Sequence, residues 1–122
     1  MRRIFFTRAS VEKIRAGKKC ATTRICKNKL QYEPNEKYQV WEGTRWKNKK
    51  TNIVIKFYKS KIWEYPTDFG RVLLDCPSLA NEEGFDGYWG AYLRELARLN
   101  PAMRGGGKVL LNTLWFEVVQ NE

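Results

Sequence analysis

The fold is decided by the stretch Ile14-Arg-Ala-Gly-Lys-Lys-Cys-Ala-Thr-Thr-Arg24. Val11 and Ile14 lie three residues apart, so they share one face of an expected helix that Thr7 or Ser10 can cap. Gly17 stands where a helix C-cap glycine belongs, because glycine adopts positive φ without steric cost. Alternating side chains over residues 19–26 then predict a strand. The stretch is therefore expected to join a helix to a strand.

Further strands are expected on both sides of this helix-strand junction. Apolar, β-branched or alternating segments predict strands over residues 4–6, 37–42, 51–65, 71–75 and 109–119. A polar and basic segment over residues 43–50 is typical of a hairpin tip. The segment 28–36, which holds Pro34 and Asn35, is expected to be a connection.

Two more helices are expected late in the chain. Ser78 opens a short helix over residues 78–83, and Asp86 is positioned to cap a longer one that Asn100-Pro101 ends. Residues 104–108 form a flexible or tightly bent loop. This order predicts an α+β fold: a mixed, mainly antiparallel and partly closed β-barrel with two or three flanking helices. At 122 residues, the chain is expected to form a single domain, residues 1–122.

The charge of the chain points to a polyanionic partner. Lys and Arg number 23 against 13 acidic residues, which gives a formal net charge of +10. Such an excess in a small domain favours nucleic acid, and the aromatic share of 14% offers surfaces on which bases can stack. The alternative is a basic surface with no partner.

Several chemistries are excluded by residue counts. The sequence has no histidine, so His-based triads and His-containing zinc sites are absent. The three cysteines are an odd number and lack metal-ligand spacing, which indicates free thiols in a reducing compartment. No signal peptide and no membrane-spanning apolar run is recognised. We expect a cytoplasmic monomer without metal, cofactor or membrane contact.

The helix-strand stretch resembles the opening signature of ASCH domains, which have PUA-like folds. Gly17, Lys18, Lys19, Thr22 and Arg24 match its Gly-Lys-Lys and Thr-x-Arg elements, whereas Thr is commoner than Cys at position 20. The segment 79–85 is similar to the helix that follows the barrel strands in that family. The resemblance implies a PUA-like barrel that binds RNA or an RNA-derived nucleoside.

The same superfamily contains small amidohydrolases that deacetylate N4-acetylcytidine with a Lys, a Thr and a Glu. The resemblance places these catalytic roles on Lys19, Thr22 and Glu83, although Glu82 is adjacent and a one-residue slip would exchange the two acids. It places a ligand-binding role on Arg24. Two alternatives stay open: a cleft that binds without chemistry, and a Lys19–Glu83 ion pair that is only structural.

Strand geometry limits this assignment. Lys19 and Thr22 are three residues apart, so they point to opposite faces of a regular strand. Both reach one cleft only if the chain bends near residues 17–21.

Other candidate ligand-binding residues lie outside this stretch. Arg45, Trp46 and Lys47 put an aromatic ring among cations, which suits base stacking and phosphate contact, or else makes a solvated hairpin tip. Tyr88 and Trp89 follow Glu83 closely and are expected to form a stacking wall. Lys18 is the last candidate ligand-binding residue.

Two functions follow from these features. RNA binding ranks first, because a net charge of +10 suits a polymer better than an uncharged nucleoside. The alternative is an amidohydrolase acting on N4-acetylcytidine-type nucleosides. A nuclease function has less support than either, since no carboxylate cluster suited to metal binding is seen in the sequence.

Overall fold

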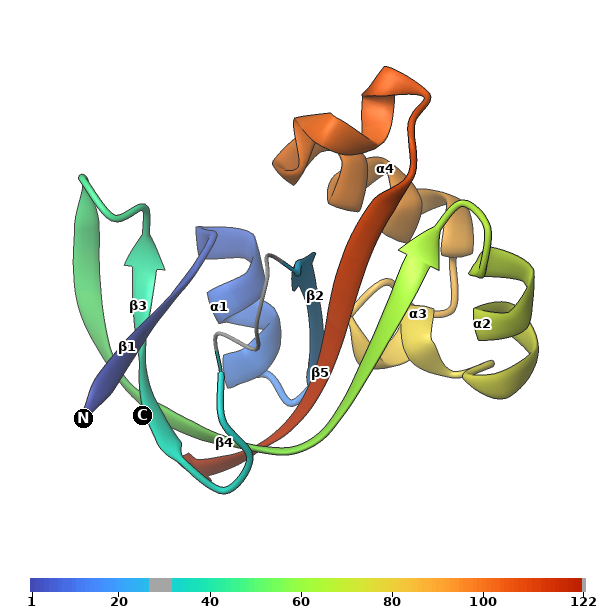
Figure 1. Ribbon diagram of the computed structural model, residues 1–122. Coiled ribbons are helices and arrows are strands. Elements are labelled where there is room, and N and C mark those ends of the chain that lie inside the picture. The colour runs from blue at the N-terminus through green and yellow to red at the C-terminus, as the bar shows by residue number, and fades with distance from the viewer. Residues whose placement is uncertain (27–31, 122) are drawn as a thin grey trace.

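The chain is described by a computed structural model that covers residues 1–26 and 32–121 (Figure 1). Residues 28–31 of the expected connection therefore lie outside the described residues. The elements, in order, are β1 (Arg2–Phe6), α1 (Arg8–Arg15), β2 (Ala21–Ile25), β3 (Lys37–Gly43), β4 (Asn48–Tyr65), α2 (Phe69–Asp75), α3 (Leu79–Glu82), α4 (Trp89–Leu99), the 3₁₀ helix η1 (Pro101–Gly105) and β5 (Val109–Gln120). The α+β class is confirmed.

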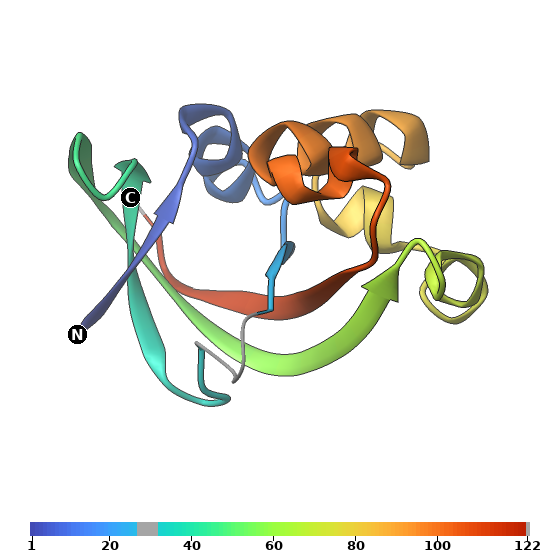
Figure 2. The ribbon, with the colours of Figure 1, turned by 45° about the horizontal axis from the view of Figure 1, so that its top comes forward.

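The five strands form one mixed sheet in the order β1-β3-β4-β5-β2. β1 runs parallel to β3, and the other neighbours are antiparallel. The long strand β4 pairs with β3 through residues 48–56 and with β5 through residues 54–65. Register shifts at Val54/Ile55 and Phe57/Lys59 allow sharp bending. Figure 2 shows β4 and β5 curving beneath α1 and α4.

Within the described residues the sheet is not closed into a barrel, so the expected, partly closed barrel is not confirmed. β1 and β2 are its two edges, and within the described residues the sheet contains no pairing between them. Instead, Arg24 on β2 donates through Nη2 to the Phe5 carbonyl on β1 at 2.7 Å. Because a side chain bridges the gap, the two edges need not approach to the roughly 4.8 Å spacing of a backbone ladder.

Two hydrophobic clusters fill the concave side. The first lies between α1 and strands β1, β3, β4 and β5, and consists of Ile4, Phe6, Val11, Ile14, Tyr38, Val40, Ile53, Ile55, Phe57, Leu114 and Phe116. The second packs the remaining helices against the other end of the sheet, and consists of Ala21, Trp63, Val72, Leu79, Ala80, Tyr92, Leu96, Met103, Leu111 and Trp115. Strand β2 lies where the two clusters meet. Its polar side chains Thr22 and Thr23 are therefore buried between apolar residues.

The helices differ from expectation in number and in one location. Residues 71–75, expected as a strand, belong to helix α2, because Phe69, Val72 and Cys76 recur at helical spacing and pack into the second cluster. The described residues contain four α-helices, not two or three. Asp86 has a positive φ of 50° and does not cap α4, which begins after Tyr88. None of the described helices is both long and apolar enough to cross a bilayer.

Candidate functional site

The turn from α1 into β2 places Lys19 at the site. Gly17 has a φ of 73°, and its N–H and that of Lys18 donate to the carbonyls of Ile14 and Lys13 at 3.0 and 2.8 Å. This pair of bonds is a Schellman motif, which ends the helix and reverses the chain. Lys19 follows at once, two residues before the first residue of β2.

Backbone bonds then fix the start of β2 against α3. The Cys20 N–H donates to the Glu82 carbonyl at 2.7 Å, and the Cys20 carbonyl accepts from the Phe116 N–H at 2.9 Å. Segments some sixty residues apart are thereby held side by side. Because Glu83 directly follows Glu82 at the end of α3, its carboxylate comes beside Lys19.

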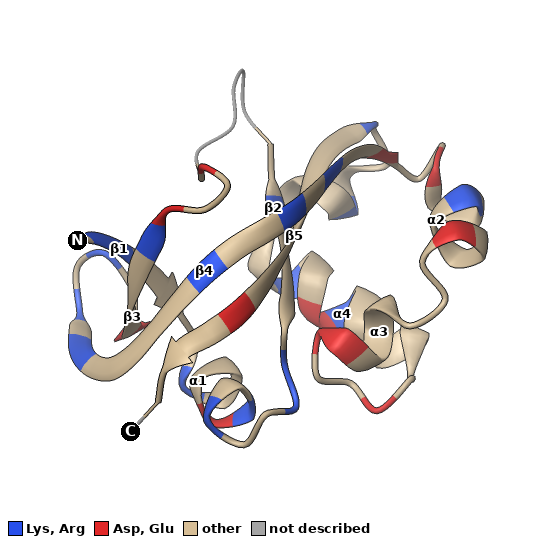
Figure 3. Cartoon of the chain, turned by 90° about the horizontal axis from the view of Figure 1, so that it is seen from below, with Lys and Arg blue, Asp and Glu red and all other residues tan. Residues whose placement is uncertain are grey.

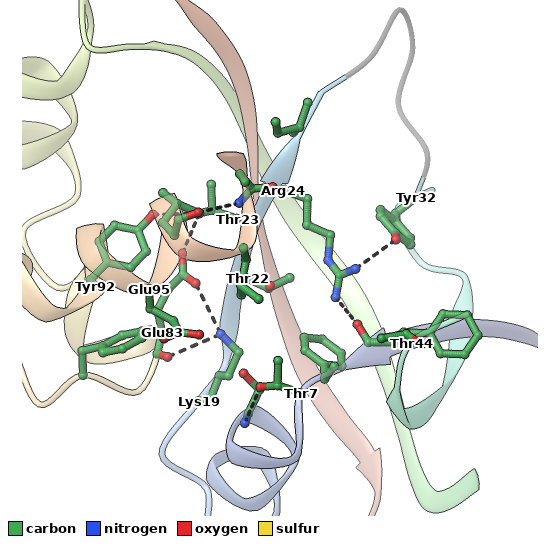
Figure 4. Close-up of a pocket in the computed structure, with 18 of the residues that line it drawn as sticks. Thr7, Lys19, Thr22, Thr23, Arg24, Tyr32, Thr44, Glu83, Tyr92 and Glu95 are labelled. Carbon is green, nitrogen blue, oxygen red and sulfur yellow. Dashed lines mark hydrogen bonds and ion pairs between the residues drawn. The ribbon is translucent and has the colours of Figure 1, made fainter. Parts of the chain in front are cut away.

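A cavity of about 400 Å³ opens between the sheet edges and α4. Its lining combines aromatic rings with a few polar groups, and Figure 4 shows these side chains converging from both strands and helices. The residues are Phe5, Phe6, Thr7, Ser10, Lys19, Thr22, Thr23, Arg24, Ile25, Tyr32, Gly43, Thr44, Glu83, Phe85, Tyr92, Glu95, Leu96, Leu99 and Asn100. The structure thus brings Lys19, Thr22, Arg24 and Glu83 around one space.

Lys19 and Glu83 form a buried ion pair. Lys19 Nζ lies 3.3 Å from Glu83 Oε1 and 3.4 Å from the Glu83 carbonyl oxygen, and each side chain is 5% exposed. Burial lowers the pKa of Lys19, because desolvation disfavours the ammonium. The Glu83 carboxylate opposes this shift, whereas Arg24 and Lys13 lower the pKa further. Lys19 therefore has a base form that is easier to reach than that of a surface lysine.

Thr23, which was not singled out in the sequence, forms more contacts here than Thr22. Its hydroxyl donates to Glu83 Oε2 at 2.5 Å and lies 2.9 Å from the Tyr92 hydroxyl and 2.8 Å from Thr113 Oγ1. Thr22 is buried and lines the cavity without such a partner. Thr22 and Thr23 alternate on β2, so no local pattern shows which of them faces the acid.

The opposing directions expected for Lys19 and Thr22 do not arise. Strand β2 begins at Ala21, so Lys19 lies in the turn and is free of strand alternation. In Figure 4 its amine extends toward Glu83 beneath Thr22. The bend required at residues 17–21 is supplied by Gly17 and the helix end.

Arg24 forms the opposite side of the cavity. Besides its bond to Phe5, its Nη1 donates to the Tyr32 hydroxyl at 3.4 Å, and its guanidinium lies 4.8 Å from the ring centre of Phe6. Its Nε is buried and has no hydrogen-bond partner among residues 1–26 and 32–121. A buried donor without a partner costs free energy, so Arg24 is held in place by its other contacts and not by a bond at Nε.

The other predicted ligand residues lie away from the cavity lining. Lys18 is exposed, and Arg45, Trp46 and Lys47 lie on the exposed β3–β4 tip, where Trp46 is 87% exposed. Tyr88 is exposed. Trp89 packs edge-on against Phe69 and Tyr92 in the second cluster, so the expected wall of Tyr88 and Trp89 is absent from the cavity.

The aromatic walls come from residues that the sequence did not mark. They are Phe5, Phe6, Tyr32, Phe85 and Tyr92. Burial and the charge of Glu83 raise the pKa of Tyr92 well above its usual value, which keeps this phenol neutral. The described part of the chain holds no group of three or more His, Cys, Asp or Glu side chains arranged for a metal ion.

The arrangement that encloses this cavity is the fold of ASCH domains. An ASCH domain from Lactobacillus crispatus JV V101 matches with a TM-score of 0.58 at 20% identity, over 93% of this chain and 72% of that one. A protein from Enterococcus faecalis V583, described by the family model DUF984, matches with a TM-score of 0.59 at 18% identity, over 89% of this chain and 69% of that one.

The sequence itself finds no match among protein-family models. No curated protein matches it significantly either. The structural likeness confirms the ASCH resemblance of residues 14–24 at the level of the fold. What the cavity binds, and whether it is catalytic, has to be argued from the residues that line it.

Proposed function

We propose that the cavity binds a nucleoside and hydrolyses an exocyclic amide of the N4-acetylcytidine kind. The observation that carries this proposal is the buried Lys19–Glu83 pair, which shares one cavity of about 400 Å³ with the Thr22 side chain. A cavity of this size falls within the ~300–1,000 Å³ typical of small-molecule sites. The net charge of +10 favours RNA binding, whereas a cavity of this volume with buried polar side chains in its lining favours a small ligand.

The residues suit an acyl-transfer reaction. Thr22 Oγ attacks the amide carbonyl carbon while the neutral amine of Lys19 takes the hydroxyl proton. The resulting ammonium returns that proton to the exocyclic nitrogen, so the C–N bond breaks and cytidine leaves. Water then attacks the threonine ester, again giving its proton to Lys19, and acetate leaves as the hydroxyl is restored. Glu83 keeps the lysine amine in place throughout.

The remaining walls suit a planar heterocycle. Phe5, Phe6, Tyr32 and Phe85 offer aromatic surface to a base. The Arg24 guanidinium, which lines the cavity, offers N–H donors to a carbonyl oxygen. A half-buried cation next to the reacting carbonyl also favours the negative charge that develops on oxygen.

Turnover of N4-acetylcytidine by the purified chain tests the proposal. Release of cytidine is expected from the unmutated protein and from Lys18→Met, whose side chain is exposed and outside the cavity. Lys19→Met is expected to lose activity. Absence of cytidine release from the unmutated, folded protein would contradict the hydrolase.

RNA binding remains a second candidate, and the β3–β4 tip favours it. Trp46 is 87% exposed, and the Arg45 guanidinium lies 5.3 Å from its ring centre. Figure 3 shows basic residues in this tip and along β4. Because Gly43 and Thr44 line the cavity, the tip begins at the cavity wall. A single strand that stacks on Trp46 would lie close to the proposed nucleoside site.

A salt titration tests this second candidate. Single-stranded RNA is expected to bind with an affinity that falls steeply as salt is added, because each neutralised phosphate releases counterions. The double variant Arg45→Ala/Lys47→Ala is expected to flatten the salt dependence. A salt response that is flat in the unmutated protein would exclude this surface as an RNA site.

A further inference from the structure

A chain of buried hydrogen bonds ends on Glu83. Trp63 Nε1 donates to Thr113 Oγ1 at 2.8 Å, and Thr113 Oγ1 lies 2.8 Å from Thr23 Oγ1. The Thr23 hydroxyl in turn donates to Glu83 Oε2, while Tyr92 lies 2.9 Å from the same hydroxyl. All five residues are buried. Thr23, Trp63 and Thr113 lie on strands β2, β4 and β5, whereas Glu83 follows α3 and Tyr92 lies on α4.

The direction of each bond follows from counting hydrogens. Thr23 has one hydroxyl hydrogen, and it is given to Glu83. With that hydrogen used, Thr23 Oγ1 can only accept from Thr113 and Tyr92, and Tyr92 also interacts with Glu83 directly. Trp63 has only a donor, so it gives its N–H to Thr113, whose own hydrogen is free to point to Thr23. Every hydrogen in the network points toward the carboxylate.

The two carboxylate oxygens of Glu83 consequently have different partners. Oε2 accepts from Thr23, and Oε1 faces Lys19 Nζ. The bond at Oε2 opposes a rotation of the carboxylate that would take Oε1 away from the amine. Figure 4 shows Thr23 and Lys19 approaching Glu83 from different directions.

We infer that Thr23, supported by Thr113, Trp63 and Tyr92, is a positioning residue that holds the Glu83 carboxylate against Lys19 and thereby sets the protonation of that lysine. The inference deepens the proposed function, on which its catalytic meaning rests. Its main readout is the titration of Lys19, which needs no turnover.

The charges around Lys19 determine the expected sign. Glu83 favours the ammonium, while Arg24 and Lys13 disfavour it. Glu95 also lines the cavity, and the thiol of Cys20 adjoins Lys19 in sequence. Loss of the Thr23 hydroxyl frees the carboxylate to turn away, so Lys19 loses its main stabilising charge. The pKa of Lys19 is then expected to fall.

The experiment compares Thr23→Val with Thr22→Val by NMR titration of the Lys19 side chain. Thr23→Val is expected to move the Lys19 midpoint to lower pH by on the order of one pH unit. Thr23→Ser keeps a hydroxyl and is expected to restore the midpoint. Thr22→Val removes the adjacent hydroxyl, for which the described residues show no bond to Glu83, and is expected to move the midpoint less than Thr23→Val does.

The outcomes separate the two proposals. A folded Thr23→Val protein with an unchanged Lys19 midpoint would overturn the positioning role. If Thr23→Val does not fold, the Lys19 titration is measured in Thr113→Val instead. A lowered Lys19 midpoint in that variant supports the positioning role, and an unchanged midpoint rejects it. Failure of the unmutated protein to release cytidine rejects the hydrolase but leaves the titration result standing. If turnover exists, the acidic limb of the Thr23→Val rate profile should move with the midpoint.

Discussion

The cavity end of β2 and the tip between β3 and β4 use charge in opposite ways. At β2, Lys19 and Glu83 are almost fully buried, paired, and supported by a directed set of hydroxyls. At the tip, Arg45, Trp46 and Lys47 are exposed, and the contacts among them are local. The first region resists change because each polar atom depends on another, whereas the second tolerates change because water surrounds it.

The comparison shows why net charge was a weak guide to function. Most of the excess of 23 basic over 13 acidic residues is spread over exposed strands and turns, where it affects association with polyanions. The chemistry proposed here depends on one lysine removed from solvent. A buried charge and an exposed charge count equally in composition, yet it is burial that lowers the pKa of Lys19.

Among these variants, Lys19→Met should cause the largest loss of unfolding free energy. It leaves the Glu83 carboxylate buried without its cation, which costs about 3–5 kcal/mol of unfolding free energy. Chemical denaturation measures this loss. Lys18→Met, one residue away and exposed, should change stability by less than about 0.5 kcal/mol. Equal stabilities for the two variants would mean that the pair contributes no more than a surface charge.

Thr22→Val should separate chemistry from stability. Turnover of N4-acetylcytidine should fall by at least about 100-fold, since the nucleophile is removed. The unfolding free energy should change little, because the described residues show no hydrogen bond to the Thr22 side chain. Thr22→Ser should retain activity. A fully active Thr22→Val protein would remove Thr22 from the mechanism and leave water as the attacking group.

Turnover and stability should both rise with pH, for related reasons. The reaction needs neutral Lys19, so the rate should rise as pH passes through the lowered pKa of this residue. The unfolded chain, in which Lys19 has its usual pKa near 10.5, binds the proton more tightly than the folded chain does. Unfolding free energy should therefore increase between the lowered pKa and 10.5. Rate and denaturation profiles measured on one preparation check both slopes.

Among these variants, Trp46→Ala should cause the smallest change in unfolding free energy. A side chain that is 87% exposed contributes little to packing, so stability should change by less than about 0.5 kcal/mol. RNA affinity should nevertheless weaken by about 1–3 kcal/mol if a base stacks on the indole. Lys59→Ala, on the exposed part of β4, serves as a control for general loss of charge. Unchanged RNA affinity in Trp46→Ala would show that the tip is not a stacking surface.

Much of the fold could be read from local pattern. The Thr7 cap, the Gly17 helix end and the strand after it appear in the structure close to their expected positions, since each depends on neighbouring residues. Helix α2 was missed because Val72, Leu73 and Leu74 form a short apolar run, and such a run is compatible with a strand or a helix. Tertiary packing of Phe69 and Cys76 decided between them.

The sequence by itself determined the α+β class, the ASCH-like helix-strand junction and the residue types available for chemistry, because these follow from spacing, propensity and counts. Only the tertiary structure decided that the sheet stays open with Arg24 across its edges, that Phe5, Tyr32 and Phe85 replace Tyr88 and Trp89 as aromatic walls, and that Thr23 contacts Glu83. These features join segments far apart in the chain, and their geometry depends on how β2, α3 and β5 pack, which no local pattern encodes.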